Sequence, residues 1–193
     1  MRNKVFKGEV GYFRYRKKRL LIATISGFLL MFLFFFTGYL IYATARNLIT
    51  ILAVLVVLPT AKIYVQYMML PWKNSGDKAF FDNIKEKYPC LDIYGEMLIT
   101  GSEKRFEITY LAIDKNDNIV AFSMNQNSDE GLFKKAVVNF LNYYNFDAKV
   151  SLCTDISTFE KKLKKLSEDR QMPTEEQREH MELVFEKISI MSI

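Results

Sequence analysis

The sequence predicts a transmembrane helical hairpin followed by a mixed α/β domain. Residues 20–42 form an apolar run without a charge, and residues 48–70 form a second apolar run after a five-residue gap. A helix of about 20 apolar residues crosses the roughly 30 Å hydrocarbon core of a bilayer. Residues 73–193 instead show short apolar patterns of strand and helix period between polar turns. We therefore expect a basic N-terminus (1–19), a transmembrane hairpin (20–72) and an α/β domain (73–193).

A secretory signal peptide is the alternative interpretation of the first apolar run. Its 23 residues exceed the roughly 7–15 residues of a signal-peptide apolar core. The small residues of Ala43-Thr44-Ala45 lead into a second apolar run rather than into a polar mature chain. Both features favour a membrane-spanning helix.

The distribution of basic residues predicts the orientation of the hairpin. Residues 1–19 contain eight Lys and Arg and one acid, Glu9, whereas the loop between the two runs contains Arg46 as its single charge. The positive-inside rule places the N-terminus in the cytoplasm, and two spans return the C-terminal domain there. Tyr12, Phe13 and Tyr15 lie among these cations, as is typical of a membrane interface. We expect a multi-pass protein of the cell membrane with both termini cytoplasmic.

Two polar residues lie inside the second apolar run. Lys62 and Gln66 are four residues apart and follow Pro59, where we expect a kink. A lysine near the end of a span can extend its long stem to the headgroups, and we expect this of Lys62. The alternative is a polar contact with a second protomer or with a partner protein.

The net charge differs between the two parts of the chain. The whole chain carries +5, but residues 73–193 contain 17 Lys and Arg against 21 Asp and Glu, which gives −4. An acidic domain is not expected to bind nucleic acid, which requires a dense cationic surface. The one basic cluster, Lys161, Lys162, Lys164 and Lys165, alternates with core-spaced leucines and is expected to be a solvated helix face.

The sequence shows no pattern for a cofactor or a metal ion. Cys90, Cys153 and His180 are too few and too far apart to predict a zinc site, and a cytoplasmic location does not favour a disulfide. Phosphate-binding and dinucleotide-binding glycine motifs are missing from the sequence. We therefore expect no cofactor, no metal ion and cysteines that are small buried residues.

The α/β domain is predicted element by element from its apolar periods. The order is αβββαβ followed by two helices. The expected helices and strands cover residues 77–87 (helix), 91–100, 104–114 and 119–125 (strands), 132–144 (helix), 148–154 (strand), 156–168 and 174–187 (helices). Turn-forming residues 115–118 join the second and third strands into a hairpin. Glu107, Thr109, Ser123 and Asn125 recur at period two on this hairpin, which predicts a solvated sheet face or, as the alternative, a ligand cleft.

This order resembles the PD-(D/E)XK, or restriction-endonuclease-like, nucleases. The hairpin segment FEITYLAIDKNDNIVAFSMN is similar to the family in its apolar pattern and in its turn. In that family a metal-binding Asp lies in the second strand, and a Glu-x-Lys triplet ends the third. The matching positions are Thr109, Ser123 and Asn125, and none of them keeps the family's residue.

The lost residues decide what this resemblance implies. Neutral Thr, Ser and Asn side chains do not hold a hard divalent cation without carboxylates. The resemblance therefore implies a nuclease-like fold without catalysis, which acts as a protein-interaction or ligand-binding module. The alternative is a membrane-tethered, metal-dependent hydrolase with relocated carboxylates, for which Glu107, Glu86 and Asp82 are the candidates.

A second resemblance covers the membrane half. The basic N-terminus, the tight apolar hairpin and the following α/β domain resemble a family of small uncharacterised bacterial membrane proteins. Some of its members are labelled O-linked GlcNAc transferase-like. The chain has no glycine-rich or paired-acid motif to support a sugar transferase. We expect the lipid bilayer, and a protein partner or a second copy of the chain, to be its partners.

We predict that a reporter fused after Ile193 is active as a cytoplasmic fusion. The eight basic residues before the first span are the physical reason. A pair of reporters, one active only in the cytoplasm and one only outside it, measures this at the same fusion point. Activity of the external reporter would reverse the predicted topology.

Overall fold

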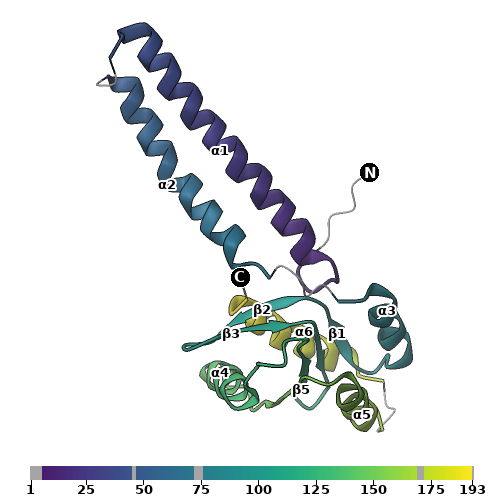
Figure 1. Ribbon diagram of the computed structural model, residues 1–193. Coiled ribbons are helices and arrows are strands. Elements are labelled where there is room, and N and C mark those ends of the chain that lie inside the picture. The colour runs from purple at the N-terminus through teal and green to yellow at the C-terminus, as the bar shows by residue number, and fades with distance from the viewer. Residues whose placement is uncertain (1–5, 45–46, 72–75, 169–171, 193) are drawn as a thin grey trace. The chain divides into compact units, whose positions relative to one another are not determined.

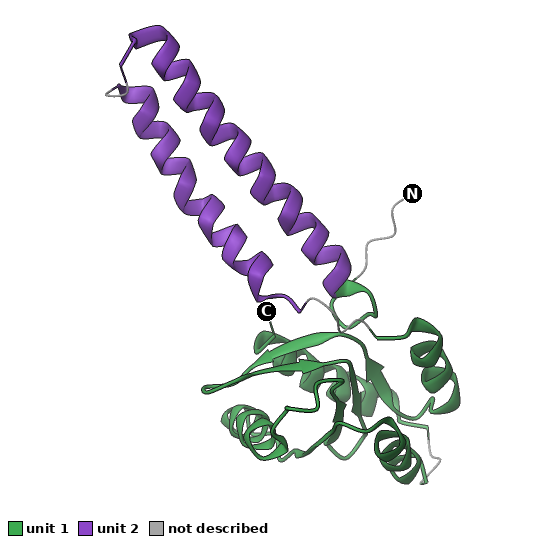
Figure 2. Cartoon of the chain, viewed as in Figure 1, with its two compact units in different colours: residues 1–12, 73–193 green, residues 13–72 purple. Residues whose placement is uncertain are grey.

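The computed structural model describes residues 6–44, 47–71, 76–168 and 172–192 (Figure 1). The chain divides into two compact units (Figure 2). Residues 13–72 form the helical unit, and residues 1–12 together with 73–193 form the α/β unit. Residues 1–12 thus belong to the same unit as the chain from residue 73 onward.

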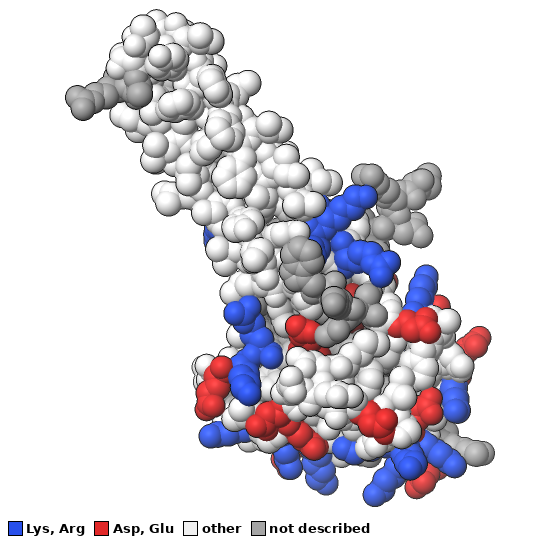
Figure 3. Space-filling model, viewed as in Figure 1, with Lys and Arg blue, Asp and Glu red and all other residues white. Residues whose placement is uncertain are grey.

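The helical unit contains two long helices, α1 (Tyr12–Tyr42) and α2 (Leu48–Met69). Both are long and apolar enough to cross a membrane. Their large apolar side chains are exposed, as Leu40 and Leu58 illustrate with 80% and 70% exposure. In the view of Figure 3, charged side chains are spread over the α/β unit, whereas most of the helical pair carries none. Such a surface suits a hydrocarbon environment.

Small residues let α1 and α2 approach each other. Gly27 lies against Thr60, where a side chain larger than hydrogen would collide. The Thr60 hydroxyl donates to the Val56 carbonyl at 2.8 Å, so its hydrogen-bond donor is satisfied within α2. Close packing of glycine and threonine is typical of membrane helices. Lys62 is exposed and Gln66 is half-buried; the reach of Lys62 to the headgroups stays a prediction.

In its described residues, 6–12, 76–168 and 172–192, the α/β unit has six strands in two sheets and four helices. The first sheet has the order β1-β4-β5-β6, in which β5 and β6 are parallel and the other pairs antiparallel; the second is the antiparallel pair β2-β3. The strands are β1 (Asp92–Tyr94), β2 (Met97–Thr100), β3 (Arg105–Ile108), β4 (Tyr110–Ile113), β5 (Asn118–Phe122) and β6 (Lys149–Cys153), and the helices are α3 (Lys78–Lys87), α4 (Glu130–Tyr143), α5 (Ile156–Leu166) and α6 (Glu175–Ile190). A mixed α/β unit after two apolar helices is therefore confirmed.

Two strands were predicted as continuous, and the structure divides each of them into two. The prediction is wrong in this respect. The strand expected over 91–100 is divided between β1 and β2 at Gly95 and Glu96, and the strand expected over 104–114 is divided between β3 and β4 at Thr109. The first break accommodates a crossing segment, because a Cβ atom on Gly95 would lie 2.7 Å from the backbone nitrogen of Val10. The order of elements after α3 is therefore five strands, α4, β6, α5 and α6.

The break at Thr109 also changes which side chains share a face. Phe106 and Ile108 pack in one apolar cluster with Leu111, whereas Tyr110 packs in the other. An unbroken strand would have placed Phe106, Ile108 and Tyr110 together. That expectation is wrong, because one residue outside the ladder shifts the period by one position.

Helices cover both faces of the four-stranded sheet, and each face has its own core. On one face, Leu111, Ile113, Ile119 and Ala121 pack with buried residues of α4 and α6. On the other face, Tyr110, Ala112, Val120 and Phe122 pack with buried residues of α3 and α5. The last helix, α6, buries Met181, Val184 and Ile188 completely. The central strands β4 and β5 therefore have no solvated face.

The predicted hairpin between β4 and β5 is confirmed. Ile113 pairs with Ile119, and the Asp114 carboxylate accepts hydrogen bonds from the Asn116 and Asn118 amides, each at 2.8 Å. The Asn118 side chain donates a third bond to it at 2.7 Å. Asp117 takes the left-handed backbone conformation that the turn needs, with φ of 57°. The Asp114 carboxylate thus stabilises the turn through three hydrogen bonds.

Residues ahead of α1 complete the α/β unit. The Lys7 ammonium group donates to the carbonyls of Ser189 and Ser192, each at 2.6 Å, at the C-terminal end of α6. A cation there satisfies carbonyls that lack helical partners and complements the helix dipole. The next carbonyl, that of Gly8, accepts a hydrogen bond from the amide of Gly95 at the first strand break.

Two glycines of this segment offer a matched test of its packing. Gly8 and Gly11 both have φ of 93°, so alanine is strained at either position, by about 1–2 kcal/mol. A Cβ atom on Gly8 would lie 2.9 Å from the Phe185 ring, whereas a Cβ atom on Gly11 would meet nothing within 4 Å. We predict that Gly8→Ala lowers the free energy of unfolding more than Gly11→Ala. Urea unfolding of the full chain in detergent, followed by circular dichroism, measures both, and equal losses would contradict the packing.

Candidate functional site

The structure brings two of the three nuclease-pattern positions together. Thr109 lies between β3 and β4, and Ser123 follows β5. Tyr110 pairs with Phe122, so the preceding Thr109 and the following Ser123 are neighbours across the hairpin, and the Thr109 amide donates to the Phe122 carbonyl at 2.8 Å. The hairpin thus holds Thr109 and Ser123 side by side.

Their burial contradicts the predicted solvated face. Thr109 and Ser123 are 2% and 0% exposed, because helices cover both faces of the sheet. Asn125, two residues further along, is exposed. The prediction of a solvated stripe is therefore wrong for Thr109 and Ser123.

The Ser123 hydroxyl takes part in a local hydrogen-bond network. Its Oγ lies 3.1 Å from the Ser128 Oγ and accepts a bond from the Asn125 amide at 3.2 Å. The Asn125 side chain in turn accepts from the Asn127 amide at 3.1 Å. The Asp129 carboxylate then caps α4 by accepting from the Leu132 amide at 3.0 Å. Ser123 therefore helps to fold the loop that leads into α4.

The carboxylates considered for a relocated metal site lie on separate elements. Glu107 is half-buried on β3, opposite Leu98 in the two-stranded sheet, and the break at Thr109 removes it from the strand face where it was expected. Asp82 and Glu86 are exposed on α3. In residues 6–44, 47–71, 76–168 and 172–192, no three His, Cys, Asp or Glu side chains are arranged to hold a metal ion.

A buried carboxylate that the sequence interpretation missed lies beside Thr109. Glu96 is 0% exposed at the break between β1 and β2, and its Oε1 accepts a hydrogen bond from the Gly76 amide at 3.2 Å. Gly76 packs closely on Thr109 and Tyr110, since its Cβ would lie 3.0 Å from atoms of both. The Tyr110 hydroxyl donates to the Asp77 carbonyl at 3.0 Å. The buried residues Glu96, Thr109 and Tyr110, which contact the start of the α3 segment at Gly76 and Asp77, form a buried polar centre.

This buried polar centre connects the start of α3 to both strand breaks. Burial raises the pKa of Tyr110 to about 12. The hydrogen bond to the Asp77 carbonyl lowers this pKa, and the negative charges of Asp77 and Glu96 raise it. The phenol is therefore protonated at neutral pH and remains a donor. The signal for this centre was Gly95-Glu96, a glycine and a charge between the apolar residues of Ile93-Tyr94 and Met97-Leu98-Ile99.

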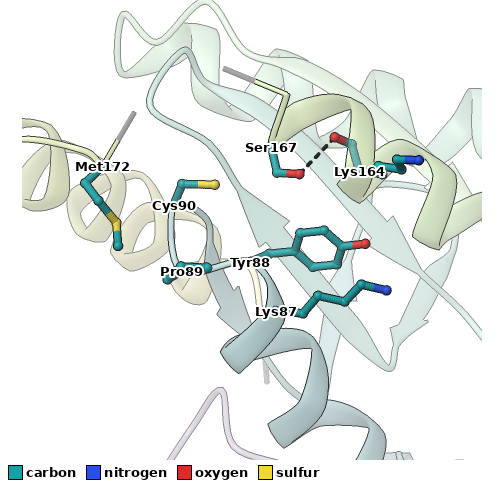
Figure 4. A pocket seen from close by; sticks show the side chains of 7 residues that line it. All are labelled: Lys87, Tyr88, Pro89, Cys90, Lys164, Ser167 and Met172. Atoms are coloured by element: carbon teal, nitrogen blue, oxygen red, sulfur yellow. Dashed lines mark hydrogen bonds between the residues drawn. The ribbon is translucent and has the colours of Figure 1, made fainter. Parts of the chain in front are cut away.

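A cavity of about 560 Å³ lies where the end of α3 meets the end of α5 (Figure 4). Its walls carry two amines and a thiol; the lining residues are Lys87, Tyr88, Pro89, Cys90, Lys164, Ser167 and Met172. The Ser167 hydroxyl donates to the Lys164 carbonyl at 2.9 Å and so caps α5 (Figure 4). Cys90 is half-buried rather than buried as expected.

The second thiol and the histidine lie outside this cavity. Cys153 is buried as expected, and burial raises the pKa of its thiol. The His180 Nε2 lies 2.9 Å from an Asp117 carboxylate oxygen. His180 thus contacts the Asp117 carboxylate of the β4–β5 turn.

The hydrogen bonds of Ser123 predict a stability difference between two neighbouring polar positions. Ser123→Ala removes the acceptor for the Asn125 amide and the partner of Ser128 inside a buried site, and we expect a loss of about 1–3 kcal/mol. Asn125→Ala changes an exposed side chain, and we expect a change within about 0.5 kcal/mol. Urea unfolding of the full chain in detergent measures both. A loss at Asn125 as large as that at Ser123 would contradict a structural role that is specific to Ser123.

Comparison with known proteins adds no relative. No family model, no curated protein and no solved structure matches this chain. The resemblance to the nucleases therefore depends on the strand arrangement and the residues of this chain itself.

Proposed function

We propose that this protein is a membrane-anchored module whose α/β unit acts in the cytoplasm by binding a protein partner or a ligand, without catalysis. The observation that carries the proposal is the state of the two paired nuclease-pattern positions. Thr109 and Ser123 are neutral and buried, and the Ser123 hydroxyl is used to fold the following loop. A buried side chain that is used for folding is not free to position an attacking water or a metal ion.

The arrangement of strands supports a degenerate nuclease-like fold. A helix precedes the sheet, β4 and β5 form a hairpin, and α4 connects β5 to the parallel strand β6. Counting only the strands of the larger sheet, this is the αβββαβ order of the PD-(D/E)XK nucleases. The extra pair β2-β3 is an insertion within that order.

Membrane anchoring by a helical hairpin is supported by which segments of the chain make up each unit. The segments before α1 and after α2 both belong to the α/β unit. A chain that crosses a bilayer twice returns to its starting side, so such a unit can assemble from both segments. The basic residues ahead of the first span favour the cytoplasmic side.

One observation favours the alternative of a membrane-tethered hydrolase. Glu96 places a carboxylate within the same buried polar centre as Thr109, the position that matches the metal-binding Asp of the nucleases. Glu107, on the neighbouring sheet, is the second candidate. A single buried carboxylate does not provide the ligand set that divalent cations require, so the non-catalytic function is the better supported one.

We predict that the full chain in detergent does not cleave DNA or RNA with Mg²⁺ or Mn²⁺. Labelled single-stranded and double-stranded substrates followed on gels measure this, with Glu96→Gln and Glu107→Ala as paired variants. Cleavage by the unmodified chain that either variant abolishes would establish the hydrolase. Residual cleavage that is equal in all three proteins identifies a contaminating nuclease and leaves the prediction standing.

A further inference from the structure

A second cavity, of about 510 Å³, is lined by residues of α5, of the parallel pair β5-β6 and of the β4–β5 turn. Its volume is within the range of small-molecule sites, about 300–1,000 Å³. Three lysines contribute to its lining: Lys149 from β6, and Lys162 and Lys165 from α5. Asn116 and Ser151 add polar groups that can donate hydrogen bonds. We call this cavity the lysine pocket.

The fold explains why the lysine pocket is open beside a packed core. Phe159 and Leu163 of α5 pack on the sheet with Phe122 and Cys153, near the C-terminal ends of β5 and β6. Asn118 and Lys149, which begin β5 and β6, lie at the opposite ends of these strands. Ser151 alternates with the buried Val150 and Leu152, so it points toward the α5 face.

The charges around the lysine pocket do not cancel. Its one carboxylate, Asp114, already accepts three hydrogen bonds in the β4–β5 turn. Within the described part of the chain, none of the three lysines forms an ion pair with a carboxylate. Lys162 is half-buried, and its ammonium group lies close to the Cys153 thiol. The side chains of three lysines thus line one concave surface of an α/β unit whose 73–193 segment is acidic overall.

We propose that the lysine pocket binds a phosphate-bearing anion of small-molecule size. Lysine acts toward phosphate as a compact point charge, and several lysines on one concave surface favour an anion with more than one negative charge. The phosphate can come from a water-soluble metabolite or from the headgroup of an anionic lipid. The site is separate from the nuclease-pattern positions and stands whether or not the chain has catalytic activity.

Titration of the full chain in neutral detergent with inorganic pyrophosphate, at constant ionic strength, tests the proposal. We expect Lys162→Gln and Lys165→Gln each to weaken pyrophosphate binding about tenfold in isothermal calorimetry, since each removes one charge-assisted hydrogen bond. Lys161→Gln is the matched control, because Lys161 is exposed on the same helix and does not line the cavity. We expect its affinity to be unchanged. Thermal unfolding of each protein confirms that it is folded. If the Lys162→Gln variant does not fold, the Lys165→Gln variant still tests the proposal, because Lys165 is exposed.

Two outcomes would overturn the proposal. One is the absence of measurable pyrophosphate binding; the other is an equal loss of affinity in Lys161→Gln and Lys165→Gln, which would indicate general electrostatic attraction. Competition then identifies the source of the phosphate. Stronger displacement of pyrophosphate by short-chain phosphatidic acid than by glycerol 3-phosphate supports a lipid headgroup, and equal displacement supports a soluble ligand.

Discussion

The pairing of β4 with β5 is the constraint on which the α/β unit depends. This hairpin is at the centre of the larger sheet and is buried on both sides, so each of its apolar side chains belongs to one core or to the other. A shift of register by one residue would exchange the two sets. The turn at Asp114 fixes the register locally, and β1 and β6 then add to its two edges. The helices pack on whichever face the register presents to them.

The same central position explains the fate of the nuclease-pattern residues. An active site on a sheet needs one open end or face at which polar side chains meet substrate. Here the neighbouring Thr109 and Ser123 are enclosed, and the polar groups around them bond to one another or to the backbone. Two open concave surfaces lie elsewhere, along the C-terminal half of α5. Binding on this unit is therefore better sought around α5 than at the hairpin.

The sequence predicted the features that depend on local patterns. Two apolar runs, the apolar periods of α4 and α5 and the turn residues 115–118 each carry their own signal, and the structure has the corresponding elements. It did not predict the breaks at Gly95 and Thr109, since their cause is non-local. Gly95 is crossed by the N-terminal segment, and Thr109 joins two sheets. Glu96 and the lysine pocket were missed for the same reason: their neighbours are far apart along the chain.

The contact between Lys7 and the end of α6 constrains the order of events during biosynthesis. The residues that it joins are 182 and 185 positions apart, so both apolar helices and most of the α/β unit are synthesised between them. Domains usually fold as they emerge during synthesis. The segment around Lys7 therefore lacks its α6 partner while α1, α2 and the rest of the α/β unit are made. The contact can form only after α6 has been synthesised, and its loop-closure entropy cost grows only slowly with the length of the intervening chain.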